Sequence, residues 1–320
     1  MRTASFVVMI LLGVSLCFGG ESYPVKPVRV IAPMAPGSLL DITARMISQQ
    51  LSEQLGRSFV VENRAGASGT IGNNYVVRSV PDGYTLLWIG PGTATVPNLH
   101  KSIPYDTIKD LAPITQIGGA AQVLVVNPSL NVTTLKEFIA LAQANPGKFN
   151  YSSAGAGAIT HLASELFKIA AKVDVSHIPY KGGGEMTSAV LSGQAQMLLT
   201  GIPTVIAHIN SGRVRALAVT TDGKRLPVLP DVPSMSEAGV SGMSVYFWFG
   251  LGGPAGMPKE VVDKLHAEVV KAISLPSVKE RFLAQGAELV GSSPEEFARH
   301  IRDELRRWGE VIKSAGITLE

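Results

Sequence analysis

The feature that most restricts the fold of this chain is a repeated alternation of short apolar segments with amphipathic ones. The apolar segments 28–33, 59–62 and 84–89 have the length of strands, and the segments 39–55 and 70–79 between them have helical spacing. The same alternation continues through the middle of the chain. Strands rich in Val and Leu that alternate with helices are typical of mostly parallel sheets covered by helices. The sequence therefore predicts an α/β fold.

The alternation occurs in two series, which indicates two lobes. The chain has 320 residues, long for one domain and sufficient for two. A Pro- and Gly-rich stretch, 227–243, separates the second series from a helical C-terminal part. Long terminal helices that follow two α/β halves often return to cover the first half. We expect crossings near Gln122 and Ser244, a discontinuous first lobe of 23–122 plus 245–320, and a second lobe of 123–244.

The N-terminal residues have the pattern of a secretion signal. A basic residue precedes the apolar run 6–18, and small residues follow it. The run is shorter than the ~20 residues that a membrane-spanning helix needs. We therefore assign 1–20 to a cleaved signal peptide and expect a periplasmic protein without stable membrane insertion. The alternative is a lipoprotein anchored through Cys17, although Leu16 is bulkier than the small residue such cleavage sites prefer.

Composition and motif spacing argue against several classes of function. A net charge of +3 and 6% aromatic residues provide little for binding nucleic acid. Cys17 is the one cysteine, so removal of the signal leaves no thiolate, and no pair among the six histidines has the i, i+4 spacing of a zinc helix. The segment 155–160 lacks the third glycine of a dinucleotide fingerprint, because Thr160 occupies that place. We expect no metal, no cofactor and no nucleic-acid partner.

Loops of small residues between a predicted strand and a predicted helix are the main functional signal. Such loops present backbone N–H groups at positive helix ends, where anions bind. Glycine allows close approach, and Ser or Thr adds a hydroxyl donor. One such loop is better explained as a tight turn, but two in each lobe favour a site for a small anion, with Lys181 as the cation among them. The four loops are 35–38, 65–70, 152–157 and 180–184.

An exported hydrolase is the competing hypothesis. Ser153 stands before Ala154-Gly155, which is half of a nucleophile elbow, but Tyr151 occupies the place where that motif has glycine. In this interpretation Ser153 would attack an ester, with His161 or His177 as the base. The spacing pairs neither histidine with an acid.

Several short motifs occur in order between Tyr23 and the C-terminus, and together they are highly specific. They are Pro36-Gly37 before Asp41, Val61-Glu62-Asn63-Arg64, Pro81-Asp82-Gly83-Tyr84, His177-Ile178-Pro179-Tyr180-Lys181-Gly182 and Leu229-Pro230-Asp231-Val232-Pro233. In this set the sequence resembles the tripartite tricarboxylate transporter substrate-binding proteins, also called the Bug family of periplasmic solute receptors.

The resemblance implies a two-lobed periplasmic-binding-protein fold without enzymatic activity. It also implies a small carboxylate held in a cleft between the lobes by backbone amides, hydroxyls and water, and docking of the closed receptor on a membrane permease. A receptor that signals without transport stays open as an alternative. By this resemblance the ligand-binding residues are Gly37, Ser38, Gly66, Ala67 and Thr70 in the first lobe, and Ser152, Ser153, Gly155, Thr160, His161, Lys181 and Gly182 in the second.

Two positions depart from the family pattern. After Pro36-Gly37 the family commonly has a second glycine and a small pair, whereas this chain has Ser38-Leu39-Leu40, which makes that wall more apolar. Thr200-Gly201 stands where many relatives have an acidic or amide residue. An acid there could hold a ligand amine, so its absence favours a ligand that is not an amino acid.

Overall fold

The computed structural model describes residues 23–284 and 286–317, and the predicted signal peptide with Cys17 lies outside these residues. The first elements along the chain are β1 (Val28–Ala32), α1 (Leu39–Leu55), β2 (Phe59–Asn63), η1 (Ala67–Gly69), α2 (Thr70–Val77), β3 (Thr85–Ile89), α3 (Gly92–Leu99) and β4 (Leu111–Val126). The middle elements are η2 (Pro128–Leu130), α4 (Leu135–Ala144), β5 (Phe149–Ser153), α5 (Ile159–Ala171), β6 (Val175–Pro179), α6 (Gly183–Leu191), β7 (Met197–Gly201), α7 (Ile202–Asn210) and β8 (Arg215–Val219). The last are β9 (Tyr246–Pro254), α8 (Lys259–Ser274), α9 (Pro276–Leu283), β10 (Ala287–Leu289) and α10 (Pro294–Ser314).

Local signals explain where the principal helices begin and end. The Ser38 side chain caps α1 by accepting the N–H of Asp41, and Gly56 ends the helix with a φ of 63°, which suits glycine. A reciprocal capping box of Ser293 and Glu296 starts α10. The predicted helix 39–55 therefore agrees with α1 at both ends.

The sheet is parallel at its two ends and antiparallel in its middle. Its order is β2-β1-β3-β9-β4-β7-β5-β6, and β8 and β10 also pair with β4. The strands of β2-β1-β3 run parallel to one another, as do those of β6-β5-β7, whereas every pairing of β4 and β9 is antiparallel. The α/β class is thus correct, but the expected mostly parallel sheet holds only for these outer sets.

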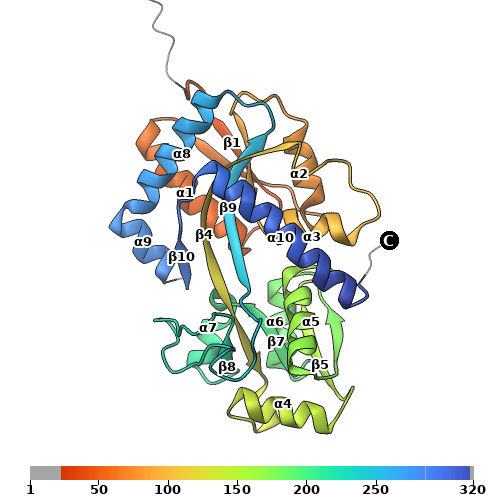
Figure 1. The fold of residues 1–320 in the computed structure, drawn as a ribbon. Coiled ribbons are helices and arrows are strands. Elements are labelled where there is room, and N and C mark those ends of the chain that lie inside the picture. The colour runs from red at the N-terminus through yellow and green to blue at the C-terminus, as the bar shows by residue number, and fades with distance from the viewer. Residues whose placement is uncertain (1–22, 285, 318–320) are drawn as a thin grey trace, which may run out of the picture.

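Two long strands connect the halves of the molecule (Figure 1). β4 pairs with β9 as far as Ala121, and from Gln122 to Val126 it pairs with β7 and β8 instead. β9 enters the sheet at Tyr246, opposite Ala121. The chain therefore passes out of the first half and back into it at neighbouring points.

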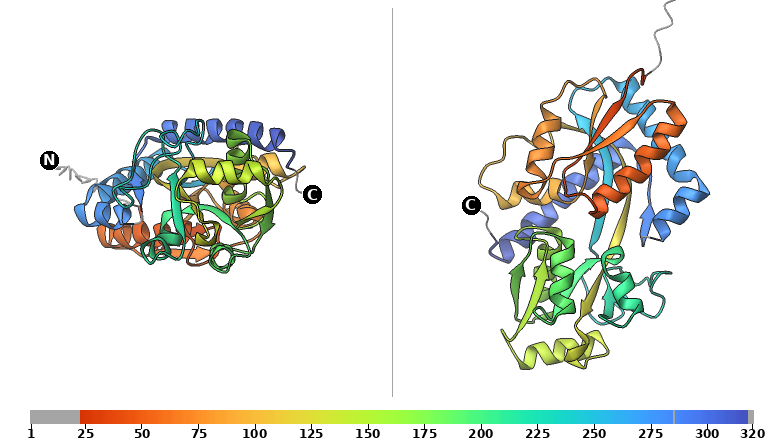
Figure 2. Two further views of the ribbon diagram at one scale, coloured as in Figure 1. Left: turned by 90° about the horizontal axis from the view of Figure 1, so that it is seen from below. Right: turned by 180° about the vertical axis from the view of Figure 1, so that it is seen from behind.

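The third connection is α10, which lies along one side of both halves (Figure 2). Its first turns contribute Phe297 and Ile301 to a core cluster with β1, β3 and α2. Its last turns contribute Trp308, Val311 and Ile312 to the core built around α4 and α5. The last turns of α10 thus pack with the second half, although they fall in the segment 245–320 that we expected in the first lobe.

Four parts of the structure are not predicted by the sequence pattern. Helix α3 contains Pro97, and α7 begins with Ile202-Pro203, so prolines obscure both. The first part of β4 contains Gly118 and Gly119 and lacks apolar alternation. β10 has three residues and is held by its pairing with β4. These elements depend on contacts distant in the sequence.

Candidate functional site

The predicted loops follow the carboxyl ends of the parallel strands, and the two halves meet beside them. A Cβ built on Gly201, at the end of β7, would lie 3.9 Å from Cδ2 of Leu39, the first residue of α1. Leu39 and Gly201 belong to the two segments, 38–40 and 200–201, that we expected to depart from the family pattern. The structure places these two residues beside each other at the junction between the halves, within van der Waals reach of a Cβ added at residue 201.

In the first loop, Asp41 organises the backbone. Its carboxylate accepts the Gly37 N–H at 2.9 Å, the Asn63 amide at 2.8 Å and the Arg45 Nε–H at 3.0 Å. Burial opposes ionisation of this group, but the bonds from Arg45, Gly37 and Asn63 outweigh it and hold the pKa of Asp41 below its usual value. Gly37 therefore gives its amide to Asp41, and Ser38 caps the helix. The amides of Leu39 and Leu40 complete the first turn at the positive end of α1.

In the second loop, four consecutive residues have positive φ. The angles are 131° at Gly66, 46° at Ala67, 53° at Ser68 and 96° at Gly69. Such backbone is costly for Ala67 and Ser68, and strain of this kind gathers at functional sites. Successive left-handed residues can form a concave nest of N–H groups that binds anions. Among the described residues, the buried hydroxyl of Thr70 has no hydrogen-bond partner.

The third loop uses most of its own amides, which differs from the exposed N–H groups we expected. Ala154 N–H donates to Thr160 Oγ1 at 3.0 Å, and Gly155 N–H donates to Ser153 Oγ at 3.1 Å. Gly157 N–H donates to Nδ1 of His161 at 2.9 Å. The side chains of Thr160, Ser153 and His161 therefore hold the shape of the loop. Ser152 is fully buried and donates to the carbonyl of Met186 in α6.

A stack of aromatic rings lies beneath this loop. The rings of His161 and His177 are 4.0 Å apart between centroids and nearly parallel, and Tyr151 stacks on His177 at 4.9 Å. His177 Nε2 lies 2.6 Å from Ser153 Oγ. Burial, and next the neighbouring His161, lower the pKa of His177 to about 4, and burial also lowers the pKa of His161. Both rings are therefore neutral near pH 7.

The same stack bears on the hydrolase hypothesis. The structure does bring Ser153 to His177, but Ser153 has no exposed surface, and rings of Tyr151 and His161 pack against the imidazole. The nearby carboxylate of Glu165 accepts the Tyr151 hydroxyl and pairs with Lys168 at 2.9 Å. Burial, followed by this bond to Glu165, raises the pKa of Tyr151. A buried serine has no access to an ester, so the geometry fits a structural role for the pair.

The fourth loop begins α6. The backbone N–H of Lys181 donates to Glu185 at 3.1 Å, and the Lys181 side chain is exposed. Gly182 has a φ of 175°, which is extended backbone, and the helix starts at Gly183. A Cβ built on Gly182 or Gly184 would meet nothing within 4 Å, so this helix end is open.

The loop residues named from the sequence thus divide into two groups. Gly37, Ser38, Ser152, Ser153, Thr160 and His161 bond to neighbouring groups of their own half and shape the loops. Gly66 and Ala67 lie in the strained turn, Thr70 follows it at the start of α2, and Lys181 and Gly182 lie at the open start of α6. Sequence reasoning missed the anchoring role of Asp41 and considered His177 only as a base.

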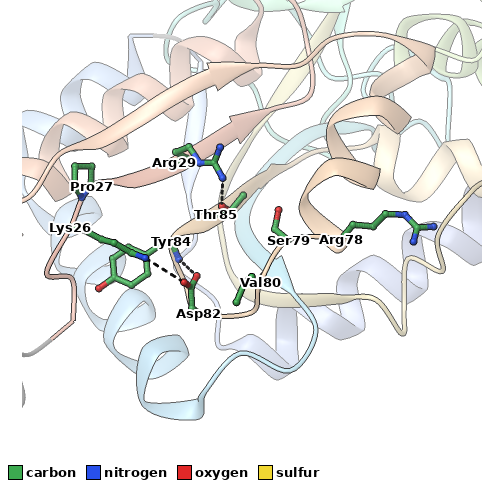
Figure 3. A pocket seen from close by; sticks show the side chains of 9 residues that line it. All are labelled: Lys26, Pro27, Arg29, Arg78, Ser79, Val80, Asp82, Tyr84 and Thr85. Atoms are coloured by element: carbon green, nitrogen blue, oxygen red, sulfur yellow. Dashed lines mark hydrogen bonds and ion pairs between the residues drawn. The ribbon is translucent and has the colours of Figure 1, made fainter.

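A separate pocket lies away from these loops. It has a volume of about 550 Å³ and is lined by Lys26, Arg29, Arg78, Asp82 and Tyr84 at the amino ends of β1 and β3 (Figure 3). Arg29 already bonds Tyr75 and Thr85, and Lys26 lies 3.7 Å from Asp82. Because this pocket lies at the amino ends of β1 and β3, opposite the strand ends that carry the predicted loops, we do not assign the ligand to it.

Two further properties concern the described residues alone. Within 23–284 and 286–317, no three His, Cys, Asp or Glu side chains gather closely enough to hold a metal ion. Over the same residues, no helix combines the length and apolarity needed to cross a membrane.

Two α/β halves joined by crossing strands, with strand-end loops of both halves at one junction, define a two-lobed solute-binding protein. The comparisons with known proteins agree. Residues 43–317 match the model of the tripartite tricarboxylate transporter family receptors. The protein BugT of Bordetella pertussis is 34% identical over 310 residues, which are 96% of this chain and 95% of BugT.

Solved structures show the same relationship. An R. palustris protein solved with adipate is 35% identical with a TM-score of 0.86, over 92% of this chain and 99% of that one. MatC from Rhodopseudomonas palustris with bound malate is 29% identical with a TM-score of 0.82, over 91% of this chain and all of MatC. The chain belongs to the tripartite tricarboxylate transporter family of receptors, the Bug-type periplasmic solute-binding proteins.

Proposed function

We propose that this protein captures a small dicarboxylate between its two lobes and delivers it to a tripartite tricarboxylate-type permease. The observation that carries the proposal is the approach of the start of α1, in the first half, to the end of β7, in the second half, where Leu39 lies beside Gly201. The relatives solved with adipate and with malate support a carboxylate as the ligand. The family's association with a transporter supports the permease as partner.

The carboxylates would be held chiefly by backbone amides. In the first lobe the candidates are the first-turn amides of α1 and the left-handed turn 66–69, whose geometry suits an anion. In the second lobe they are the open amides at Gly182 and Gly183, with Lys181 as a nearby cation. Ser153, Thr160 and His161 would act by keeping the third loop in shape. Neutral amides can bind an anion without adding a fixed charge that would hinder its release.

The Leu39–Gly201 contact supports a ligand without an amine. Leu39 is apolar, and no side chain extends from residue 201, so neither position supplies a carboxylate to pair with an ammonium group. An amine placed there would lose hydration without gaining a partner, which is unfavourable. A dicarboxylate with an apolar middle, such as adipate, would instead place methylene groups against Leu39.

Closure of the lobes would complete the site. The proposed lobes are 23–122 plus 245–320 and 123–244, with β4 and β9 as the crossings and with the last turns of α10 packed on the second lobe. A ligand that touches both lobes binds the closed form better and shifts the population toward it. The protein would reach the periplasm by means of the signal peptide 1–20.

A thermal-shift screen tests this function. The protein is unfolded and refolded to remove carried-over ligand, and is then heated with dicarboxylates, tricarboxylates, amino acids or neutral sugars. A ligand at ~100 times its Kd adds ~2.7 kcal/mol to the free energy of unfolding. That should raise the midpoint by about 5–10 °C. Shifts confined to dicarboxylates support the proposal, whereas shifts with amino acids or sugars alone would refute it.

A further inference from the structure

A buried carboxylate lies outside the proposed site, on the helix that runs along both halves. Glu304 of α10 is 8% exposed. Its Oε2 accepts the indole N–H of Trp248 at 3.0 Å and the indole N–H of Trp308 at 2.9 Å. A buried carboxylate is unfavourable unless hydrogen bonds compensate its lost hydration. The two indoles supply that compensation through one oxygen atom.

The two indoles belong to different cores. Trp248 lies on β9 and packs in the cluster that contains Ile31, Leu87 and Phe297 of the first half. Trp308 packs in the cluster built around α4 and α5 of the second half. The Glu304 carboxylate therefore receives one hydrogen bond from each core.

Other bonds hold the same part of α10 at the crossing. Arg307 lies 3.5 Å from the other oxygen of Glu304 and donates to the carbonyl of Ser244 at 2.5 Å. Ser244 stands just before β9, where the chain returns to the first half. Asn98, in α3, donates to the carbonyl of Leu305 at 2.9 Å. The helix is thus fixed to the returning chain as well as to both cores.

We infer that Glu304 is a positioning residue that sets the angle between the two lobes, and through it the affinity for the ligand. A rotation of one lobe about β4 and β9 has to move Trp308 relative to Trp248. A single shared acceptor allows each indole to turn about the same oxygen while its bond persists. Without the carboxylate, both indole N–H groups are buried without an acceptor, and the lobe angle loses its restraint. This inference rests on the lobe motion that the proposed function includes.

The test measures the lobe angle without any ligand. Spin labels are placed on Glu53→Cys of α1 and Lys136→Cys of α4, two exposed positions in different halves, in a full-length chain that carries Cys17→Ser. Pulsed electron paramagnetic resonance then measures the distribution of distances between the labels. We expect Glu304→Ala to shift and broaden this distribution, Trp308→Phe to broaden it less, and Glu304→Gln, which keeps an acceptor oxygen, to restore most of it.

Thr43→Val is the matched control. Thr43 is buried and accepts the indole N–H of Trp88 at 3.1 Å, entirely within the first half. The substitution Thr43→Val therefore removes the acceptor of an indole N–H without affecting the link between the halves. If the distances in Glu304→Ala match those in Thr43→Val, the inference is wrong and Glu304 only stabilises a core. Adipate is added to the wild-type protein in a separate measurement. If the distances between the labels do not become shorter with any dicarboxylate, the proposed closure is wrong, but the role of Glu304 is not affected.

Discussion

Replacing Asp41 by alanine removes the acceptor that organises the first loop. The Gly37 amide loses its acceptor, and the Asn63 side chain and Arg45 each lose one of theirs. A hydrogen bond to a charged group contributes about 1.5–3 kcal/mol. These contributions are not additive, and Gly37 and Arg45 can turn to water, so we expect a total loss of about 2–4 kcal/mol in the free energy of unfolding. Asp41→Asn keeps the shape and one acceptor and should lose about half of that.

The pH dependence of stability separates the effect of the negative charge of Asp41 from the effect of the shape of its side chain. The pKa of Asp41 is held below its usual value, so its stabilising effect is fully present above the unfolded-state pKa of about 3.9 and is lost as the pH falls through the folded-state value. The difference between wild type and Asp41→Asn should therefore be constant from about pH 5 to 7 and become smaller toward about pH 3. Urea unfolding at each pH measures the difference.

Asp263→Asn provides the control, because Asp263 pairs with Lys259 at 2.6 Å but is 55% exposed. Exposed pairs contribute at most about 1 kcal/mol, so this variant should remain close to wild type. The reasoning fails if Asp41→Asn is as stable as wild type at pH 7, or if the difference is as large at low pH as at neutral pH.

Three other predictions concern the junction and its loops. In the folded protein His177 stays neutral down to a pKa of about 4, whereas in the unfolded chain it takes up a proton near pH 6.5. The free energy of unfolding should therefore fall as the pH drops from about 6.5 to about 4, and thermal unfolding should show a smaller fall in His177→Asn. Gly201→Asp, at a φ of −60° that any residue adopts, should weaken adipate binding at least ~10-fold in calorimetry, whereas Gly201→Ala should not. Gly72→Ala should lower stability by about 1–3 kcal/mol because its Cβ would lie 2.8 Å from Pro33, whereas Gly184→Ala, in open space, should be neutral.

Local chemistry explains which parts of the fold the sequence predicts well. Helix α1 is predicted at both ends because Ser38 and Gly56 cap it with their own side-chain and backbone preferences. The first part of β4 is different, since Gly118 and Gly119 have no intrinsic preference for a strand. That segment is extended because β9 and β10 pair with it, and β9 lies more than a hundred residues further along the chain. The apolar run 244–251 does predict a strand where β9 lies, but the first part of β4 carries no periodic signal of its own.

In the candidate site, too, the sequence predicts the local features but not the contacts between distant segments. Small residues after strands correctly indicate loops at the strand ends, because glycine and serine permit tight turns. The pattern does not show which amides stay open, since that depends on where distant side chains end. His161 takes the Gly157 amide, and Asn63 reaches Asp41 from the neighbouring strand. Nor does the pattern place Leu39 against Gly201, because that contact joins segments from different halves.

The last turns of α10 have a consequence for attempts to exchange parts between members of this family. A chimera cut at residues 123 and 244 transfers a second half whose core is completed by Trp308, Val311 and Ile312 of the recipient. These side chains are buried, so a mismatch in their volume leaves a void or a clash at the centre of the transplanted half. Biosensors with altered ligand preference are therefore better built by exchanging individual loops, or by moving the C-terminal helix together with the segment it completes.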